Sequence, residues 1–151
     1  MSDGLLFWHG GVPGLRAGDL ILPGHERKHL DGCVFCEARA AQASGGPKPA
    51  LDALSERPDR VYATTHRLYA RYYASLFGRG DLYRVRAQDD AELERSWEDY
   101  VPTWTARAWL VVAVVDRAVM LTWPERRRLV REWEMYELLA YAPIKVDSDK
   151  P

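Results

Sequence analysis

The sequence predicts an α+β fold, with a small mixed or antiparallel sheet and flanking short helices. Short strand-forming segments are interspersed with short helical ones in no regular alternation. Residues 107–115, "RAWLVVAVV", read as the clearest strand, and residues 66–77, "HRLYARYYASLF", carry apolar and aromatic side chains at helical spacing. The chain has 151 residues, the size of one ordinary domain. We therefore expect a single domain over residues 1–142 and a polar tail over 143–151.

The other elements follow from alternation and from end signals. Residues 81–87 alternate, with Tyr83 and Val85 on one face, and are predicted to be a strand. Thr122 and Glu125 stand in capping-box relation and start a helix that is expected to reach about Tyr141. The remaining predicted elements are strands at 5–9 and 60–65, helical pieces at 36–43 and 51–57, an acidic helix at 89–100 and a hairpin strand at 118–122.

Composition limits the classes of function. The chain is 47% hydrophobic and 28% charged, which is typical of a soluble globular protein. The formal net charge of -1 supplies no general attraction to nucleic acid or to an anionic membrane. No apolar run approaches the roughly 20 residues of a membrane span, and the first residues lack the pattern of a signal peptide. We expect a cytoplasmic protein with neither a membrane nor a nucleic acid as its partner.

The segment "HERKHLDGCVFC" gathers His25, His29, Cys33 and Cys36, four of the six His and Cys residues of the chain. Zinc takes four such ligands tetrahedrally, and four protein ligands leave no position for a catalytic water. The cluster therefore predicts a structural zinc that staples a glycine-rich loop. The alternative is coincidence, with the two His on a charged surface turn and the two Cys buried as small hydrophobic residues.

Two motifs in the first half of the chain occur in a characteristic order. A strand ending in Trp8-His9-Gly10 precedes a leucine-x-x-Gly-Asp turn at 15–19. The segment 60–85 then has a strand with Tyr62 and a Thr, an alanine- and aromatic-rich helix, a Gly turn and a strand reading aromatic-x-Val. This arrangement resembles the rifampin ADP-ribosyltransferases and related diphtheria-toxin-type transferases. The resemblance covers about residues 5–87 and, more loosely, the strand at 108–115.

The resemblance implies that the four main strands share one mixed or split sheet with helix 66–77 packed on it. It also implies that NAD is a substrate. His9 would bond a ribose hydroxyl, and Gly10 would let the dinucleotide lie against the backbone. Tyr62 would pack on the nicotinamide, and Tyr69 or Tyr72 would wall that pocket.

The expected catalytic carboxylate is displaced. The family keeps this acid near the start of a later strand, where this chain reads "TARA" with Arg107. Glu98, which precedes that strand, is the first candidate. Its negative charge would stabilise an oxocarbenium-like ribose.

The sequence does not decide between three functions. The first is an enzyme that cleaves NAD and transfers ADP-ribose to an acceptor that the sequence does not identify. The second is an inactive module of the same fold that binds a nucleotide or a protein. The third is a zinc-stapled structural or assembly protein. The alternative to an NAD-binding role for His9 is a core histidine that is hydrogen-bonded to the backbone. For Tyr62 the alternative is an ordinary aromatic residue of a strand.

Overall fold

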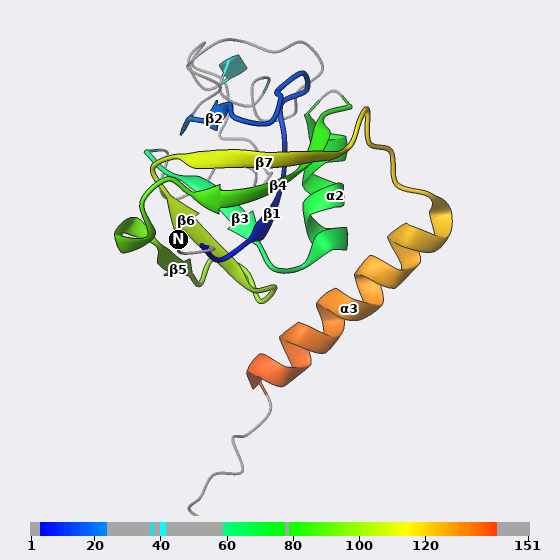
Figure 1. Cartoon of the computed structure of the whole chain (residues 1–151). Coiled ribbons are helices and arrows are strands. Elements are labelled where there is room, and N and C mark those ends of the chain that lie inside the picture. Colours follow the sequence, from blue (N-terminus) through cyan, green and yellow to red (C-terminus); the bar gives the residue numbers. More distant parts are fainter. Residues whose placement is uncertain (1–3, 24–36, 38–39, 42–58, 78, 142–151) are drawn as a thin grey trace, which may run out of the picture.

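The computed structural model describes residues 4–23, 37, 40–41, 59–77 and 79–141. One antiparallel sheet with strand order β2-β7-β4-β1-β3-β6-β5 carries helix α2 on one face, and helix α3 extends away from it (Figure 1). The strands are β1 (Phe7–Gly11), β2 (Leu20–Ile21), β3 (Val61–Thr64), β4 (Asp81–Ala87), β5 (Glu94–Ser96), β6 (Thr103–Ala106) and β7 (Trp109–Asp116). The helices are α2 (Arg67–Leu76) and α3 (Trp123–Tyr141). Neither described helix is both long and apolar enough to cross a lipid bilayer.

The α+β class is confirmed, and every strand pair of the described sheet is antiparallel. Strand β4 has the bounds expected for it, and Tyr83 and Val85 are buried on one face as the alternation predicted. The predicted start of α3 is also confirmed. The Glu125 amide donates to Thr122 Oγ1 at 3.2 Å, and the Thr122 amide donates to Glu125 Oε1 at 3.0 Å. The pieces expected at 36–43 and 51–57 fall mostly outside the described residues, as does the tail at 143–151.

Two expected elements are wrong. Residues 89–100 contain only a 3-10 turn, Asp90–Glu92, and then strand β5 instead of a helix. Asp89 caps this turn through its side chain, and β5 pairs with β6, so tertiary pairing overrides the helical composition. Residues 118–122 do not return as a strand. Ala118 instead adopts a positive φ of 48°, and the chain turns away toward α3.

The buried carboxylate of Asp81 holds the turns at this end of the sheet. Its oxygens accept from the Gly14 amide at 2.8 Å, from the Ala118 amide at 2.9 Å and from Arg117. Burial alone would raise the pKa of Asp81, but these hydrogen bonds and the Arg117 charge outweigh it and lower that pKa. The carboxylate thus joins the turn after β1 to the turn after β7.

Opposite faces of the sheet bury different groups. On one face Phe7, Tyr83 and Val85 pack with Trp109, whose indole N–H donates to the Val61 carbonyl at 2.8 Å. On the other face, α2 lies against β1 and β4 through small residues.

Gly10 sets the distance between α2 and the sheet. A Cβ added at Gly10 would lie 1.8 Å from the Ala70 carbonyl oxygen and 2.5 Å from the Ala74 amide nitrogen. Both atoms belong to the backbone of α2 and cannot swing aside. Only glycine at this position allows the helix to lie directly on β1.

We predict that Gly10→Ala costs about 3 kcal/mol of unfolding free energy, because the added methyl group must push the helix backbone outward. Gly4→Ala is the matched control, since a Cβ there meets nothing closer than 3.6 Å. Urea unfolding of the two variants measures the difference. Equal stabilities for both variants would contradict the close packing at Gly10.

Candidate functional site

Tyr62 and Glu98, two of the residues singled out in the sequence, lie together. The Tyr62 hydroxyl donates to Glu98 Oε2, which also accepts from the Ser96 hydroxyl at 3.2 Å. The strand register explains the meeting, because β6 lies between β3 and β5. Tyr62 pairs with Thr105 of β6 and Ser96 pairs with Thr103, so both side chains point to the face that carries α2. Glu98 itself is exposed and is the second residue after the end of β5.

A second acid, Asp99, meets the tyrosines of α2. The Tyr69 hydroxyl donates to Asp99 Oδ2 at 2.5 Å and lies 3.2 Å from the Tyr73 hydroxyl. Burial, joined by the neighbouring charges and hydrogen bonds, raises the pKa of Tyr69 far above its ordinary value. Burial also raises the pKa of Tyr73 to about 12, opposed by its hydrogen bond with Tyr69 and helped by the charges of Asp99 and Glu98. Both phenols therefore stay protonated at neutral pH and act as donors.

The tyrosines of α2 differ in their access to solvent. Tyr69 is only 4% exposed and packs edge-on against Tyr73 and against Trp133 of α3. Tyr72 is half-buried, with its ring centre 5.6 Å from that of Tyr73. Tyr62 is also half-buried. Of the three predicted tyrosines, Tyr62 and Tyr72 are therefore partly accessible to solvent, whereas Tyr69 is buried.

His9 is tied to the backbone of Tyr62 rather than to its hydroxyl. Its Nδ1 lies 2.7 Å from the Tyr62 carbonyl oxygen. A carbonyl only accepts, so Nδ1 carries the proton and Nε2 of the neutral ring is an acceptor. Burial, opposed by this hydrogen bond, lowers the pKa of His9 to about 4. The imidazole is therefore uncharged at neutral pH.

Strands β1 and β3 are paired over only a short stretch beside His9. The two strands share one registered pair, Trp8 with Thr64. Beyond that pair the Tyr62 carbonyl takes its hydrogen bond from the His9 ring. A Cβ at Gly11 would lie 2.4 Å from His9 Nε2, so a glycine there leaves room for the ring. On the α2 side, the helix backbone fills the space next to Gly10, and the dinucleotide contact to the Gly10 backbone stays a prediction.

The predicted zinc ligands His25, His29, Cys33 and Cys36 lie outside the described residues. In the part of the chain that the structure describes, no three or more His, Cys, Asp or Glu side chains are grouped to hold a metal ion. The structural zinc therefore stays a prediction.

Three residues that contact the predicted site residues are not themselves predicted by the sequence: Ser96, Asp99 and Tyr73. The four-residue spacing of Tyr69 and Tyr73 is a usable signal, because such residues are neighbours on a helix. Ser96 has no local signal, since its strand is only three residues long. A surface hollow of about 380 Å³ near Arg86 and Asp90 involves none of these residues.

No family model, no curated protein and no solved structure matches this chain.

The lowered pKa of His9 predicts a loss of stability in acid. Between pH 6.5 and 4 the unfolded chain binds a proton at His9 that the folded protein does not, so the free energy of unfolding falls as the pH falls. A difference of about 2.5 pKa units corresponds to about 3 kcal/mol at most. His9→Asn keeps an N–H near the Nδ1 position and removes the titration. Urea unfolding of both proteins across this range should show the steeper decline in the wild type, and parallel curves would contradict the assignment.

Proposed function

We propose that this protein is an ADP-ribosyltransferase-like enzyme that binds NAD beside Tyr62, Glu98 and His9 and transfers its ADP-ribose group to an acceptor. The observation that carries the proposal is the hydrogen bond between the Tyr62 hydroxyl and Glu98. An exposed carboxylate is thereby held at the end of a half-buried aromatic ring, where a ligand has access to both groups.

The pairing of Tyr62 with Glu98 suits the binding of a cationic nicotinamide ring. Aromatic faces attract a planar cation, so the half-buried Tyr62 ring offers a surface for it. The Glu98 carboxylate beside this ring would stabilise positive charge as it develops on the ribose. Hydrogen bonds from Tyr62 and Ser96 hold the carboxylate in place before any ligand binds, which lowers the cost of organising the site.

His9 would contribute a hydrogen-bond acceptor. Because Nδ1 donates to the Tyr62 carbonyl, Nε2 has a lone pair that can accept from a ribose hydroxyl. The lowered pKa keeps this nitrogen unprotonated at neutral pH. Strand alternation puts the His9 ring on the face opposite α2, stacked on Tyr83, so Nε2 would meet a different part of NAD from the part beside Glu98.

The reaction would exchange one bond at the ribose C1′ atom. The bond from C1′ to the nicotinamide nitrogen breaks, and its electron pair leaves with neutral nicotinamide. A lone pair of the acceptor, or of water, forms the new bond to C1′, and the acceptor loses one proton. Glu98 would stabilise the cationic ribose between these two events.

Glu98→Gln should lower the rate of nicotinamide release from NAD by about 10²–10³-fold while leaving NAD binding nearly unchanged, because the charge is needed mainly in the transition state. The measurements are nicotinamide release by chromatography and NAD binding by calorimetry. Glu94→Gln is the matched control, since Glu94 is an exposed acid on β5, four residues before Glu98, and its carboxylate is 4.0 Å from Arg60. The control should keep the wild-type rate.

The wild-type protein decides between the three functions. NAD binding without nicotinamide release would reject the enzyme in favour of the inactive binding module. Neither binding nor release at millimolar NAD would reject the nucleotide site altogether.

A further inference from the structure

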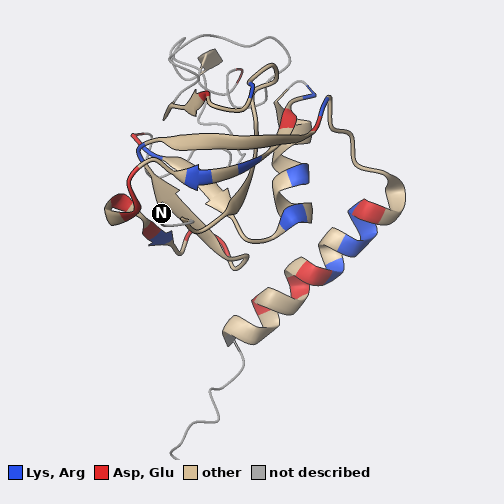
Figure 2. Cartoon of the chain, in the orientation of Figure 1, with Lys and Arg blue, Asp and Glu red and all other residues tan. Residues whose placement is uncertain are grey.

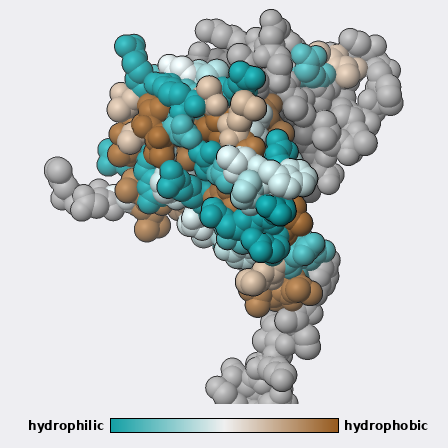
Figure 3. Space-filling model, turned by 90° about the vertical axis from the view of Figure 1, so that its right-hand side faces the viewer, coloured by the Kyte–Doolittle hydropathy of each residue, from teal (hydrophilic) through white to brown (hydrophobic). Residues whose placement is uncertain are grey.

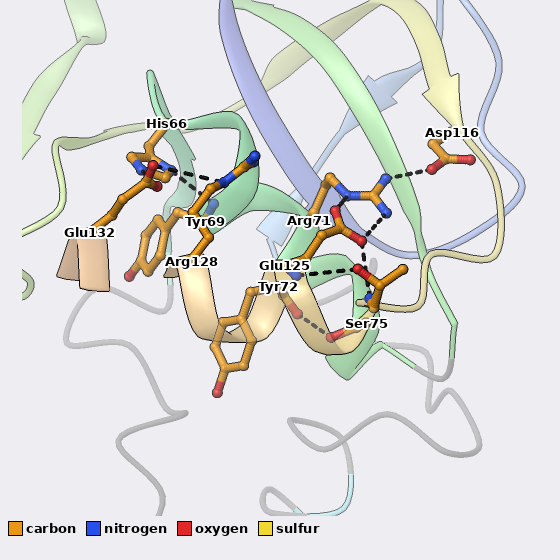
Figure 4. Close-up of polar contacts among 10 residues, drawn as sticks. His66, Tyr69, Arg71, Tyr72, Ser75, Asp116, Glu125, Arg128 and Glu132 are labelled. Atoms are coloured by element: carbon orange, nitrogen blue, oxygen red, sulfur yellow. Dashed lines mark hydrogen bonds and ion pairs between the residues drawn. The ribbon is translucent and has the colours of Figure 1, made fainter. Parts of the chain in front are cut away.

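Helix α3 is held to the domain by charged contacts along one side (Figure 4). Arg71 of α2 lies 2.8 Å from Glu125 Oε2 and 2.5 Å from Asp116 Oδ2 at the end of β7. About two turns further along α3, His66 Nε2 lies 2.8 Å from Glu132 Oε2. Two separate pairs thus orient α3 about its own axis.

Apolar contacts agree with this orientation. Leu129 is buried against α2, and Trp133 and Tyr136 pack partly buried on the same cluster. With Glu125 and Glu132, these residues recur at intervals of three and four, which is one face of a helix. This face of α3 is therefore the one directed at the domain.

The opposite face of α3 is exposed and carries large apolar side chains. Trp123, Val130 and Leu138 are 69%, 57% and 71% exposed. Arg127 and Glu134 are exposed between them. Each of these five lies two residues from a domain-facing position, slightly more than half a helical turn. Figure 3 shows apolar atoms gathered at the lower, C-terminal end of the described helix, where Met135 and Leu139 are also exposed.

The charges of α3 are segregated along its length. Apart from Glu125, which faces the domain in the first turn, the first half carries four arginines and the second half carries three glutamates, as the blue and red bands of Figure 2 show. The arginines are Arg126, Arg127, Arg128 and Arg131, and the glutamates are Glu132, Glu134 and Glu137. In the described part of the chain, Arg127, Arg131, Glu134 and Glu137 form no ion pair. The outward face is therefore a basic half followed by an acidic half, with apolar residues throughout.

We propose that the outward face of α3 is the interface of a homodimer, in which the α3 helices of two copies pack antiparallel. Antiparallel alignment sets the arginine half of each helix against the glutamate half of the other, and the two-fold symmetry supplies this match twice. Parallel alignment would oppose arginines to arginines and glutamates to glutamates, which is repulsive. Trp123, Val130 and Leu138 lose their exposure to water in the pair.

The length of the helix sets the strength of the association. Its 19 residues span about 28 Å, so two such helices bury an area at the low end of specific interfaces. We therefore expect micromolar self-association that weakens at high salt, because the ion pairs remain close to solvent. Sedimentation velocity over a range of protein concentrations measures this directly.

Two charge variants test, without knowledge of the register, whether opposite charges on the outward faces of α3 drive the pairing. Arg127→Glu with Arg131→Glu makes the outward face acidic throughout, and Glu134→Lys with Glu137→Lys makes it basic throughout. Each variant alone should be monomeric at concentrations where the wild type is dimeric, and an equimolar mixture of the two should form a heterodimer. All four positions are exposed and lie away from the domain, so thermal melting of each variant at low concentration should match that of the wild-type monomer.

A wild-type protein that stays monomeric at every concentration would overturn the proposal. Variants that dimerise as well as the wild type would also overturn it, since the interface would then lie elsewhere. Failure of the mixture to associate, with both variants folded, would reject the antiparallel arrangement.

Discussion

The close packing of α2 on Gly10 is the constraint on which the rest of the structure depends. The helix backbone occupies the space where any side chain at Gly10 would lie. From that position Tyr69 reaches Asp99, Arg71 reaches both Asp116 and Glu125, and His66 reaches Glu132. Gly10 therefore determines where the tyrosines of α2 lie beside the candidate site and where α3 contacts the domain.

The candidate site is assembled across the sheet rather than along the chain. Tyr62 comes from β3, Ser96 and Glu98 come from β5 and its end, and β6 between these strands sets their register. His9 joins from β1 through the Tyr62 carbonyl, where the ladder between β1 and β3 is a single pair. A carboxylate, a protonated phenol and a neutral imidazole thus come from three segments, with the imidazole on the opposite face of the sheet from the other two.

The parts that the sequence predicts are those with local signals. The alternation of β4, the capping box of Thr122 and Glu125 and the helical spacing of α2 all depend on nearby residues, and each is confirmed. The helix predicted at 89–100 is wrong. The acidic composition of this segment favours a helix, but pairing with β6 makes part of it a strand. That pairing is non-local, and so is the meeting of Ser96 with Glu98 and Tyr62. The α2 packing at Gly10 likewise depends on contacts 60 residues apart in the sequence, which no local pattern predicts.

An NMR titration of the ¹⁵N-labelled protein with NAD tests the location of the nucleotide site most directly. If NAD binds at the proposed site, the amide signals of His9, Tyr62 and residues 96–99 shift in a saturable way, while those on the outward face of α3 do not move. Saturable shifts confined to the hollow near Arg86 and Asp90, or no shifts at millimolar NAD, would contradict the proposed site.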